Sequence, residues 1–250
     1  PPELREDRGE IAAAAAHQLP ELVSVSDLRG DLHMHTTATD GRDDIDAMAR
    51  AARARGHEYI AITDHSQALA MANGLDETRA LAHAAQVRAR NGREAGLTLL
   101  AGIECDILAD GTLDLADDCL AQLDLVIASV HSHFSQSPEQ MTDRLLRAIE
   151  HRWVDVIGHP TGRLLLAREA YGFDIERVVA AAVRHGVAFE INSQTNRLDF
   201  NDVHARFAVA AGARVVISTD AHSTAALGNL PWGVQTARRA WLRPDDVLNT

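Results

Sequence analysis

Lysine is absent from this chain of 250 residues, so all 24 of its basic residues are arginines. A Walker-A phosphate-binding loop needs a lysine that reaches the phosphates, and a Schiff-base mechanism needs a lysine amine, so both are excluded. Cysteine is scarce as well. Cys105 and Cys119 provide neither a disulfide framework nor a Cys-x-x-Cys metal site, which is typical of a protein of the reducing cytoplasm.

Long apolar runs are absent, and aromatic residues are scarce. No stretch reaches the length that a membrane-spanning helix needs, and we find no charged-then-apolar leader, so we expect a cytoplasmic protein without a membrane partner. Aromatic residues make up only 4% of the sequence, which leaves few side chains for stacking along single-stranded nucleic acid. The net charge of −12 disfavours unaided binding to a polyanion, although bound divalent cations would restore positive charge where a substrate sits.

The order of apolar and helical segments predicts a single α/β domain over residues 28–250. Residues 1–27 are acidic or rich in alanine and are interpreted as a linker, with a short helix over residues 11–17. Beyond them, short β-branched runs alternate with segments of helical period, as in βα units around a parallel sheet. The expected strands are residues 28–32, 59–63, 98–103, 125–130, 155–158, 188–192 and 214–219, and the expected helices are residues 43–55, 77–94, 138–152, 175–185 and 202–211, with caps at Gly56, Gly96, Gly186 and Gly212.

Histidines and carboxylates recur where these apolar runs end. In parallel barrels the carboxyl ends of the strands share one rim, so side chains placed there meet in one site. Imidazoles and carboxylates gathered in this way suit several divalent metal ions. The residues concerned are His33, His35, His65, Glu104, His131, His159, Asp220 and His222. The other histidines lie mostly in or just after helices and are expected to be solvated or capping, with His133 left open as a substrate contact: His17, His57, His83, His133, His151, His185 and His204.

The motifs at these positions resemble those of the PHP family (polymerase and histidinol phosphatase). They are Asp31-Leu32-His33-Met34-His35-Thr36 with Asp40-Gly41, Ile62-Thr63-Asp64-His65, Gly102-Ile103-Glu104, Ser129-Val130-His131, Gly158-His159-Pro160 and Ser218-Thr219-Asp220-Ala221-His222. The stretch Gly158 to Leu165, the Glu190-Ile191-Asn192 segment and the Arg197-Leu198-Asp199 segment resemble more closely the C-terminal PHP domain of bacterial family X DNA polymerases. The opening Pro1-Pro2-Glu3-Leu4-Arg5 resembles the linker that joins that domain to the polymerase region.

The resemblance implies a distorted (β/α)7 TIM-like barrel with three divalent metal ions. Carried over by motif position, His33, His35, Glu104 and Asp220 would hold the first ion, Glu104, His131 and His159 the second, and Asp40, His65 and His222 the third. Two ions bridged by a carboxylate can activate a shared water and stabilise the oxygens of a phosphoryl transfer. Glu104, Asp220 and His131 are therefore the expected catalytic residues. We expect manganese to support activity, with zinc or iron as further candidates.

Four further residues are predicted to contact substrate. Arg163 and Arg197 follow strand-end motifs, and the guanidinium fork matches two phosphate oxygens. Asn192 and His133 are expected to orient a ligand or phosphate. Asp64 is expected to hold an imidazole in its tautomer, and Cys105 is expected to point away from the site.

Our leading hypothesis is a metal-dependent phosphodiesterase that acts as a 3′-5′ exonuclease and removes nucleotides from DNA 3′ ends in repair. We expect it to be attached to an N-terminal family X polymerase region, which would supply the affinity for DNA. Two alternatives stay open: a phosphomonoesterase of the histidinol-phosphatase type, and a non-catalytic module that scaffolds a polymerase. Amidohydrolases share the His-x-His opening and a closing Asp on a barrel. They are disfavoured because they commonly use a carboxylated lysine, and the chain has none.

Overall fold

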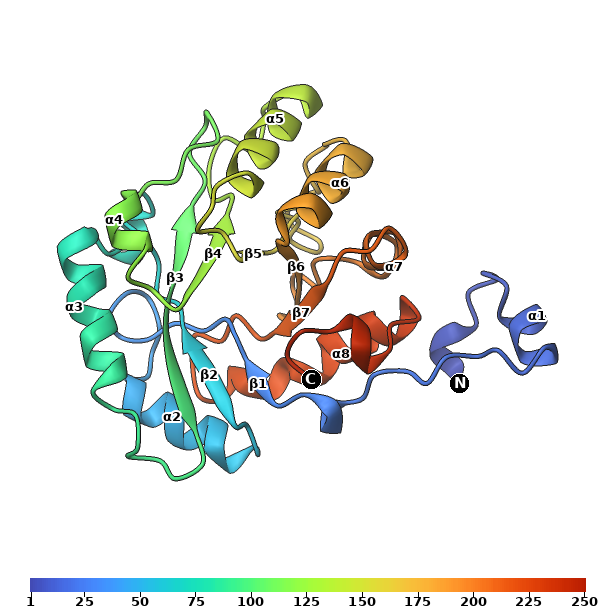
Figure 1. Ribbon diagram of the computed structural model, residues 1–250, viewed down its shortest axis with the longest axis horizontal. Coiled ribbons are helices and arrows are strands. Elements are labelled where there is room, and N and C mark those ends of the chain that lie inside the picture. Colours follow the sequence, from blue (N-terminus) through green and yellow to red (C-terminus); the bar gives the residue numbers. More distant parts are fainter.

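All seven predicted strands form one parallel sheet in the order of the chain, which confirms the barrel prediction. The computed structural model describes residues 1–250, and Figure 1 shows helices around the outside of the strands. The strands are β1 (Gly30–Asp31), β2 (Tyr59–Ile62), β3 (Thr98–Asp106), β4 (Leu125–Ser129), β5 (Val156–Ile157), β6 (Ala188–Asn192) and β7 (Val215–Ser218). The helices are α1 (Glu10–Ala15), α2 (Ile45–Ala54), α3 (Glu77–Arg88), α4 (Asp117–Leu120), α5 (Pro138–Ile149), α6 (Ile175–His185), α7 (Asp202–Ala210) and α8 (Leu230–Arg239).

The barrel closes between β7 and β1 without a full strand ladder, through side chains and through one backbone bridge between Met34 and Ala221. Asn249 fills the gap at the amino ends of these strands, where its Nδ2 atom donates to the carbonyls of Gly30 and Ile217 at 2.8 Å each. Higher up, the Asp31 carboxylate accepts hydrogen bonds from the backbone and hydroxyl groups of Thr219. The sheet is therefore a nearly closed, distorted barrel whose seam lies beside the first and last site motifs.

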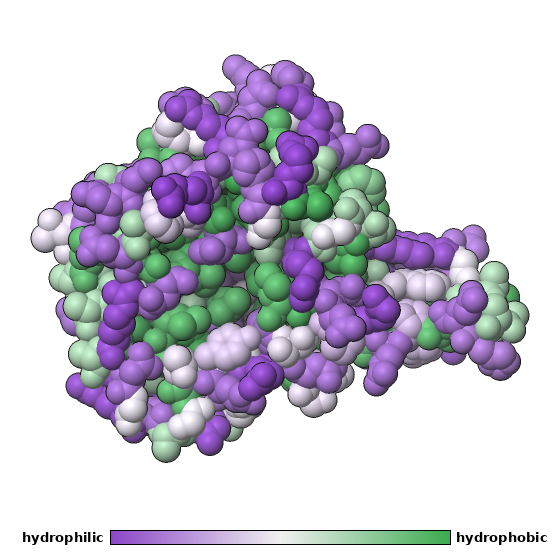
Figure 2. Space-filling model, viewed as in Figure 1, coloured by the Kyte–Doolittle hydropathy of each residue, from purple (hydrophilic) through white to green (hydrophobic).

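The helices form where a polar cap precedes an amphipathic segment. In α2, Asp44 accepts a hydrogen bond from the Ala47 N–H at 2.8 Å, and Ile45, Met48 and Ala52 are buried on one face. Equivalent caps begin the other long helices that follow strands β2, β4, β5 and β6, namely Asp76, Ser137, Asp174 and Asn201. Hydrophobic residues gather at the centre of the face shown in Figure 2, and hydrophilic residues cover its outline. None of the helices combines the length and apolar character needed to cross a membrane.

Several boundaries differ from the sequence prediction. Strand β3 continues to Asp106, so Glu104 lies inside a strand and not after one. Helix α3 ends at Arg88, well before Gly96, because Asn91 exchanges two hydrogen bonds with the backbone of Leu99 and draws the chain toward β3.

Helix α8 was not predicted from the sequence. Its first turn tolerates Pro231, but Gly233 has a low helix propensity and weakens the helical pattern. Gly233 is required by close packing, since a Cβ atom there would lie 2.1 Å from Ser193 Oγ.

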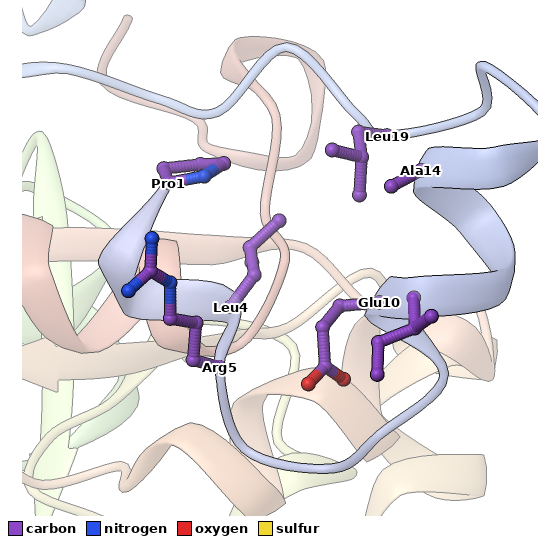
Figure 3. A pocket seen from close by; sticks show the side chains of 7 residues that line it. Pro1, Leu4, Arg5, Glu10, Ala14 and Leu19 are labelled. Carbon is purple, nitrogen blue, oxygen red and sulfur yellow. The ribbon is translucent and has the colours of Figure 1, made fainter.

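The segment over residues 1–27 extends away from the barrel beyond α8, and α1 lies at its far end (Figure 1). Ion pairs join Glu3 to Arg238 at 2.7 Å and Arg8 to Asp202 at 2.8 Å. Helix α1 buries none of its residues, and a pocket lies between it and the 3-10 turn Pro2–Leu4 (Figure 3). The segment is therefore fastened to α7 and α8 by charged contacts.

Candidate metal centre

Glu104 lies at the centre of the predicted cluster. Its Oε2 atom is 3.3 Å from His33 Nε2 and 2.9 Å from His65 Nδ1. Its Oε1 atom is 2.9 Å from His159 Nε2 and 3.3 Å from His131 Nε2. One buried carboxylate thus faces imidazoles from four different strand ends, which is the convergence that the barrel prediction requires.

Two aspartates complete the cluster. Asp220 Oδ1 lies 3.1 Å from His35 Nε2 and 3.6 Å from His222 Nδ1. Asp40 Oδ2 lies 3.5 Å from His65 Nε2 and 3.4 Å from His222 Nε2. The structure therefore brings together all nine predicted metal ligands, including Asp40, which sits on a loop after β1.

Three groups within this cluster have ligand atoms within 4.8 Å of one another. They are His33, His35 and Asp220; His65, Glu104 and His131; and His35, Asp40, His65 and His222. These groups overlap the three sets implied by the resemblance. His35 and His65 each belong to two of these groups. The distances between side chains therefore do not assign each residue to a single ion, as the motif positions do.

Strand geometry explains how each ligand reaches the site. Alternation along β3 points Glu104 and Asp106 to one face and Cys105 to the other, where its Sγ atom lies 3.1 Å from Asp114. Strand β1 ends at Asp31, so the backbone leaves the regular pleat before the His-x-His pair. His159 and Asp220 adopt left-handed backbone conformations, with φ of 28° and 49°, which are uncommon for residues with a side chain and cluster at functional sites.

A second layer of carboxylates orients the imidazoles. Glu190 accepts a hydrogen bond from His33 Nδ1 at 2.7 Å and another from the backbone N–H of His159 at 2.8 Å. Asp106 contacts His131 Nδ1. Carboxylates in this position fix the tautomer and orientation of a metal-binding histidine. Neither role was predicted from the sequence, although Asp106 follows Glu104 by two residues on the same face of a strand.

Asp64 holds an imidazole, as predicted, but the imidazole is that of His83. It contacts no imidazole of the cluster. Instead it accepts a hydrogen bond from His83 Nε2 at 2.8 Å and others from Thr36 and Thr39, in the loop that leads to Asp40. The expectation of a solvated or capping His83 is wrong for the same reason, because this histidine is buried against Asp64. His57 is also buried.

The cluster fits metal ions on chemical grounds. His33 Nε2, His65 Nδ1 and Glu104 Oε2 are buried and have no hydrogen-bond partner, and such atoms are costly to bury unless something binds them. Burial lowers the pKa of His65 and His131, but the charge of Glu104 outweighs it and raises their pKa values to about 10 and about 9. In the absence of a metal ion, protons on His65 and His131 therefore offset the negative charge of Glu104. Burial and the neighbouring His65 lower the pKa of His35 to about 4.

Of the four residues predicted to contact substrate, only Arg197 lines the cleft. Arg197 lines the cleft above the cluster, 3.6 Å from Asp220, and its Nε and Nη1 atoms are buried without a hydrogen-bond partner. Arg163 does not line the cleft. It donates to the carbonyls of Arg197 and Leu198 and so supports the loop that carries Arg197. Asn192 donates to Glu190 and Asp220, and His133 is exposed outside the cleft.

The cleft itself has a volume of about 230 Å³. Its floor is the metal cluster, and its walls add residues that the sequence analysis did not single out. They are Leu69, Met71, Phe134, Leu164 and Arg168. No periodic or spacing signal distinguishes these residues from ordinary loop residues, because they enter the cleft from separate strand-end loops.

Fold and site together define an α/β barrel protein with a histidine and carboxylate cluster suited to several metal ions at the carboxyl ends of its strands. The sequence profile of the PHP domain matches residues 31–194, and this chain belongs to the PHP family.

Individual relatives agree with that assignment. The chain is 42% identical over 249 residues to the DNA polymerase/3′-5′ exonuclease PolX of Bacillus subtilis, a match that covers 100% of this chain and 43% of that relative's length. It is 31% identical over 231 residues to a probable phosphatase of Caldanaerobacter subterraneus, covering 88% of this chain and 86% of the relative. In structure it resembles the histidinol phosphate phosphatase of Lactococcus lactis complexed with zinc, L-histidinol and phosphate. The TM-score is 0.59 at 15% identity, over 84% of this chain and 93% of the other.

Proposed function

We propose that this chain is a metal-dependent phosphodiesterase that removes nucleotides from the 3′ ends of DNA, as part of a longer protein with a polymerase region. The observation that carries the proposal is the central position of Glu104, whose two oxygens face different imidazoles of one buried cluster. The 42% identity to a relative named as a polymerase and 3′-5′ exonuclease supports the substrate.

In this proposal the chain's own residues hold and orient the reacting groups. His33, His35, Glu104 and Asp220 would hold the first ion, Glu104, His131 and His159 the second, and Asp40, His65 and His222 the third. When bound, divalent ions supply activation of the attacking water and stabilise charge on the phosphate oxygens. Manganese is the ion that we expect to support activity best, with zinc or iron as further candidates.

Arg197 is placed to bind the scissile phosphate. Its guanidinium borders Asp220 at the mouth of the cluster and has buried N–H groups free for an anion. Asn192 holds the other oxygen of Asp220 at 2.9 Å, and Glu190 and Asp106 keep His33 and His131 in place. Hydrolysis of the terminal phosphodiester then breaks the bond between phosphorus and the 3′ oxygen, and water supplies the new oxygen. In the cytoplasm, the polymerase region would provide the affinity for DNA that a chain of net charge −12 lacks.

The test is release of mononucleotides from 5′-labelled single-stranded or gapped DNA in the presence of manganese. Asp220→Ala removes a proposed ligand, so we expect activity to fall by more than about 100-fold, beyond the 10–100-fold effect of residues that merely support ligands. Arg177→Ala, which removes an exposed ion pair on α6, is the control and should keep full activity. Undiminished release by Asp220→Ala would refute the proposal.

A phosphomonoesterase is the second candidate. It is favoured by the 31% identity to a probable phosphatase that this chain covers almost completely. Removal of a 3′-terminal phosphate, compared with cleavage of the adjacent phosphodiester in the same oligonucleotide, separates the two activities. A scaffold without catalysis would release neither product and would bind no metal in elemental analysis.

A further inference from the structure

Phe134 and Arg168 form a stacked pair on the wall of the cleft. The guanidinium carbon of Arg168 lies 3.8 Å from the centre of the Phe134 ring. Its Nε atom donates to the Gly162 carbonyl at 2.8 Å, which fixes the plane of the group. Phe134 in turn packs on the hydrophobic core and lies 6.4 Å from the ring of Tyr171. The pair is therefore held in place before any ligand arrives.

The backbone that carries Arg168 is equally fixed. Leu164 and Arg168 form an antiparallel bridge with two hydrogen bonds of 2.8 Å, and the N–H of Leu165 donates to the Asn196 carbonyl at 2.7 Å. Arg168 forms no ion pair, and its one side-chain hydrogen bond is to the Gly162 carbonyl. A guanidinium without a carboxylate, at the mouth of a metal cluster, is available to a ligand.

Apolar side chains border the same cleft. Leu164 lies beside the stacked pair, and Leu69 and Met71 enter from the loop after β2. Met71 is 93% exposed, so folding does not explain its position. Contact with an apolar surface would remove water from a charged phosphate at an energetic cost. A flexible methionine side chain, in contrast, packs well against a flat, polarisable group.

We propose that Phe134, Arg168 and Met71 form a subsite for the base of the 3′-terminal nucleotide, while Arg197 and the cluster receive its phosphate. This inference rests on the proposed function. Nucleobases stack on arginine planes and aromatic rings and tolerate apolar edges. The cleft volume of about 230 Å³ lies below the roughly 300–1,000 Å³ of typical ligand pockets, and so suits one nucleotide and not several.

The experiment uses two 5′-labelled single-stranded oligonucleotides that differ only in the last unit, which is either dT or an abasic tetrahydrofuran analogue. With manganese, we expect the chain to remove dT with a kcat/KM about tenfold higher, which corresponds to about 1.4 kcal/mol. Met71→Ser and Arg168→Gln should each bring this ratio toward one. Met71 is so exposed that its replacement leaves the fold intact, which keeps the test valid if Arg168→Gln disturbs the loop.

Leu166→Ser is the matched control, because Leu166 is a fully exposed apolar residue of the same loop that does not line the cleft. Its ratio should stay at the wild-type value. Equal removal of dT and the abasic unit by the wild-type chain would overturn the subsite while leaving the exonuclease proposal intact. Equal loss of activity on both ends in Arg168→Gln, with an unchanged ratio in Met71→Ser, would show that Arg168 binds a phosphate and would also overturn it. Cleavage of neither end would instead count against the proposed function.

Discussion

The amide of Asn192 bridges Glu190 and Asp220, donating at 3.1 Å to the first and at 2.9 Å to the second. Asp220 is buried, and Asn192 is the only side-chain amide that donates to its carboxylate, so Asn192 sets the direction in which the carboxylate faces His35. Asn192, which was grouped with the predicted substrate contacts, thus positions Asp220, a proposed metal ligand.

We therefore predict that Asn192→Leu weakens metal binding. The apolar side chain leaves Glu190 and Asp220 without their shared donor, and loss of such a contact costs about 10–100-fold in metal affinity. Titration of the metal-free protein with manganese measures the change. Asn196→Leu places the same substitution on an exposed residue of the next loop and should leave affinity unchanged. Equal affinities in the two variants would contradict the supporting role.

Metal removal should destabilise the fold through Glu104. Chelation leaves six imidazoles and two aspartates around the carboxylate of Glu104, so we expect the melting temperature of the wild-type chain to fall on treatment with EDTA and to recover with manganese. In Glu104→Gln, which keeps the shape but loses the charge, chelation should have little further effect. A chelator effect of equal size in both proteins would mean that Glu104 is not central to metal binding.

The metal-free protein should lose stability as the pH rises above neutrality. The pKa of His65 is raised to about 10 in the folded chain, against an ordinary value of 6.5. The folded state therefore holds a proton that the unfolded state releases, and the resulting stabilisation is complete below pH 6.5 and disappears as the pH approaches 10. Urea denaturation at pH 7 and pH 9.5 measures this. His65→Gln should show a smaller difference between the two pH values, and an equal difference would show that other groups dominate.

The same protons make metal affinity depend on pH. His65 and His131 must lose their protons before they can bind a cation. Manganese affinity should therefore rise from pH 6 to pH 8, with protons released on binding. Calorimetry in two buffers of different ionisation enthalpy detects this release, and a buffer-independent binding enthalpy would contradict it.

Close packing of α8 on β6 gives a prediction about stability. In Gly233→Ala the new Cβ would lie 2.1 Å from Ser193 Oγ and 2.8 Å from Ile217 Cγ2, so we expect a loss of about 1–3 kcal/mol. Ser193 Oγ is buried without a partner, so adding Ser193→Ala should recover part of that loss. Gly228→Ala has open space around it and is the control. Chemical denaturation measures the free energy of unfolding of each variant. Strictly additive effects of Gly233→Ala and Ser193→Ala would show that the two side chains do not touch and would contradict the prediction.

Sequence patterns were sufficient for the sheet and for the proposed ligands because both depend on short-range periodicity. All of the predicted strands except residues 188–192, which end on Asn192, end at or near a histidine or carboxylate, and the parallel order of the strands brings these ends to one rim. Glu104 shows the limit of this reasoning. It was expected after its strand and lies inside it, because pairing with β4 extends β3 through Asp106.

The residues around the ligands could not be predicted in the same way. Arg163 was predicted to contact a phosphate and instead donates to backbone carbonyls of the loop that carries Arg197. Asp64 holds an imidazole, but that of His83, and Asn192 orients Asp220. Hydrogen-bond partners of a polar side chain depend on which loops lie beside it, and the sequence analysis placed those loops only by the strands they follow.

The sequence by itself determined the parallel strands, the eight proposed ligands at strand ends and the absence of lysine chemistry, because strand periodicity and residue type are local properties of the chain. Asp40 and the three ligand sets followed from the resemblance to the PHP family. The tertiary structure decided which carboxylate orients which imidazole, that Arg197 and not Arg163 borders the cluster, and that Phe134, Arg168 and Met71 share its cleft. These relationships join residues from different strand-end loops, and packing in three dimensions is what brings such loops within a few ångströms of one another.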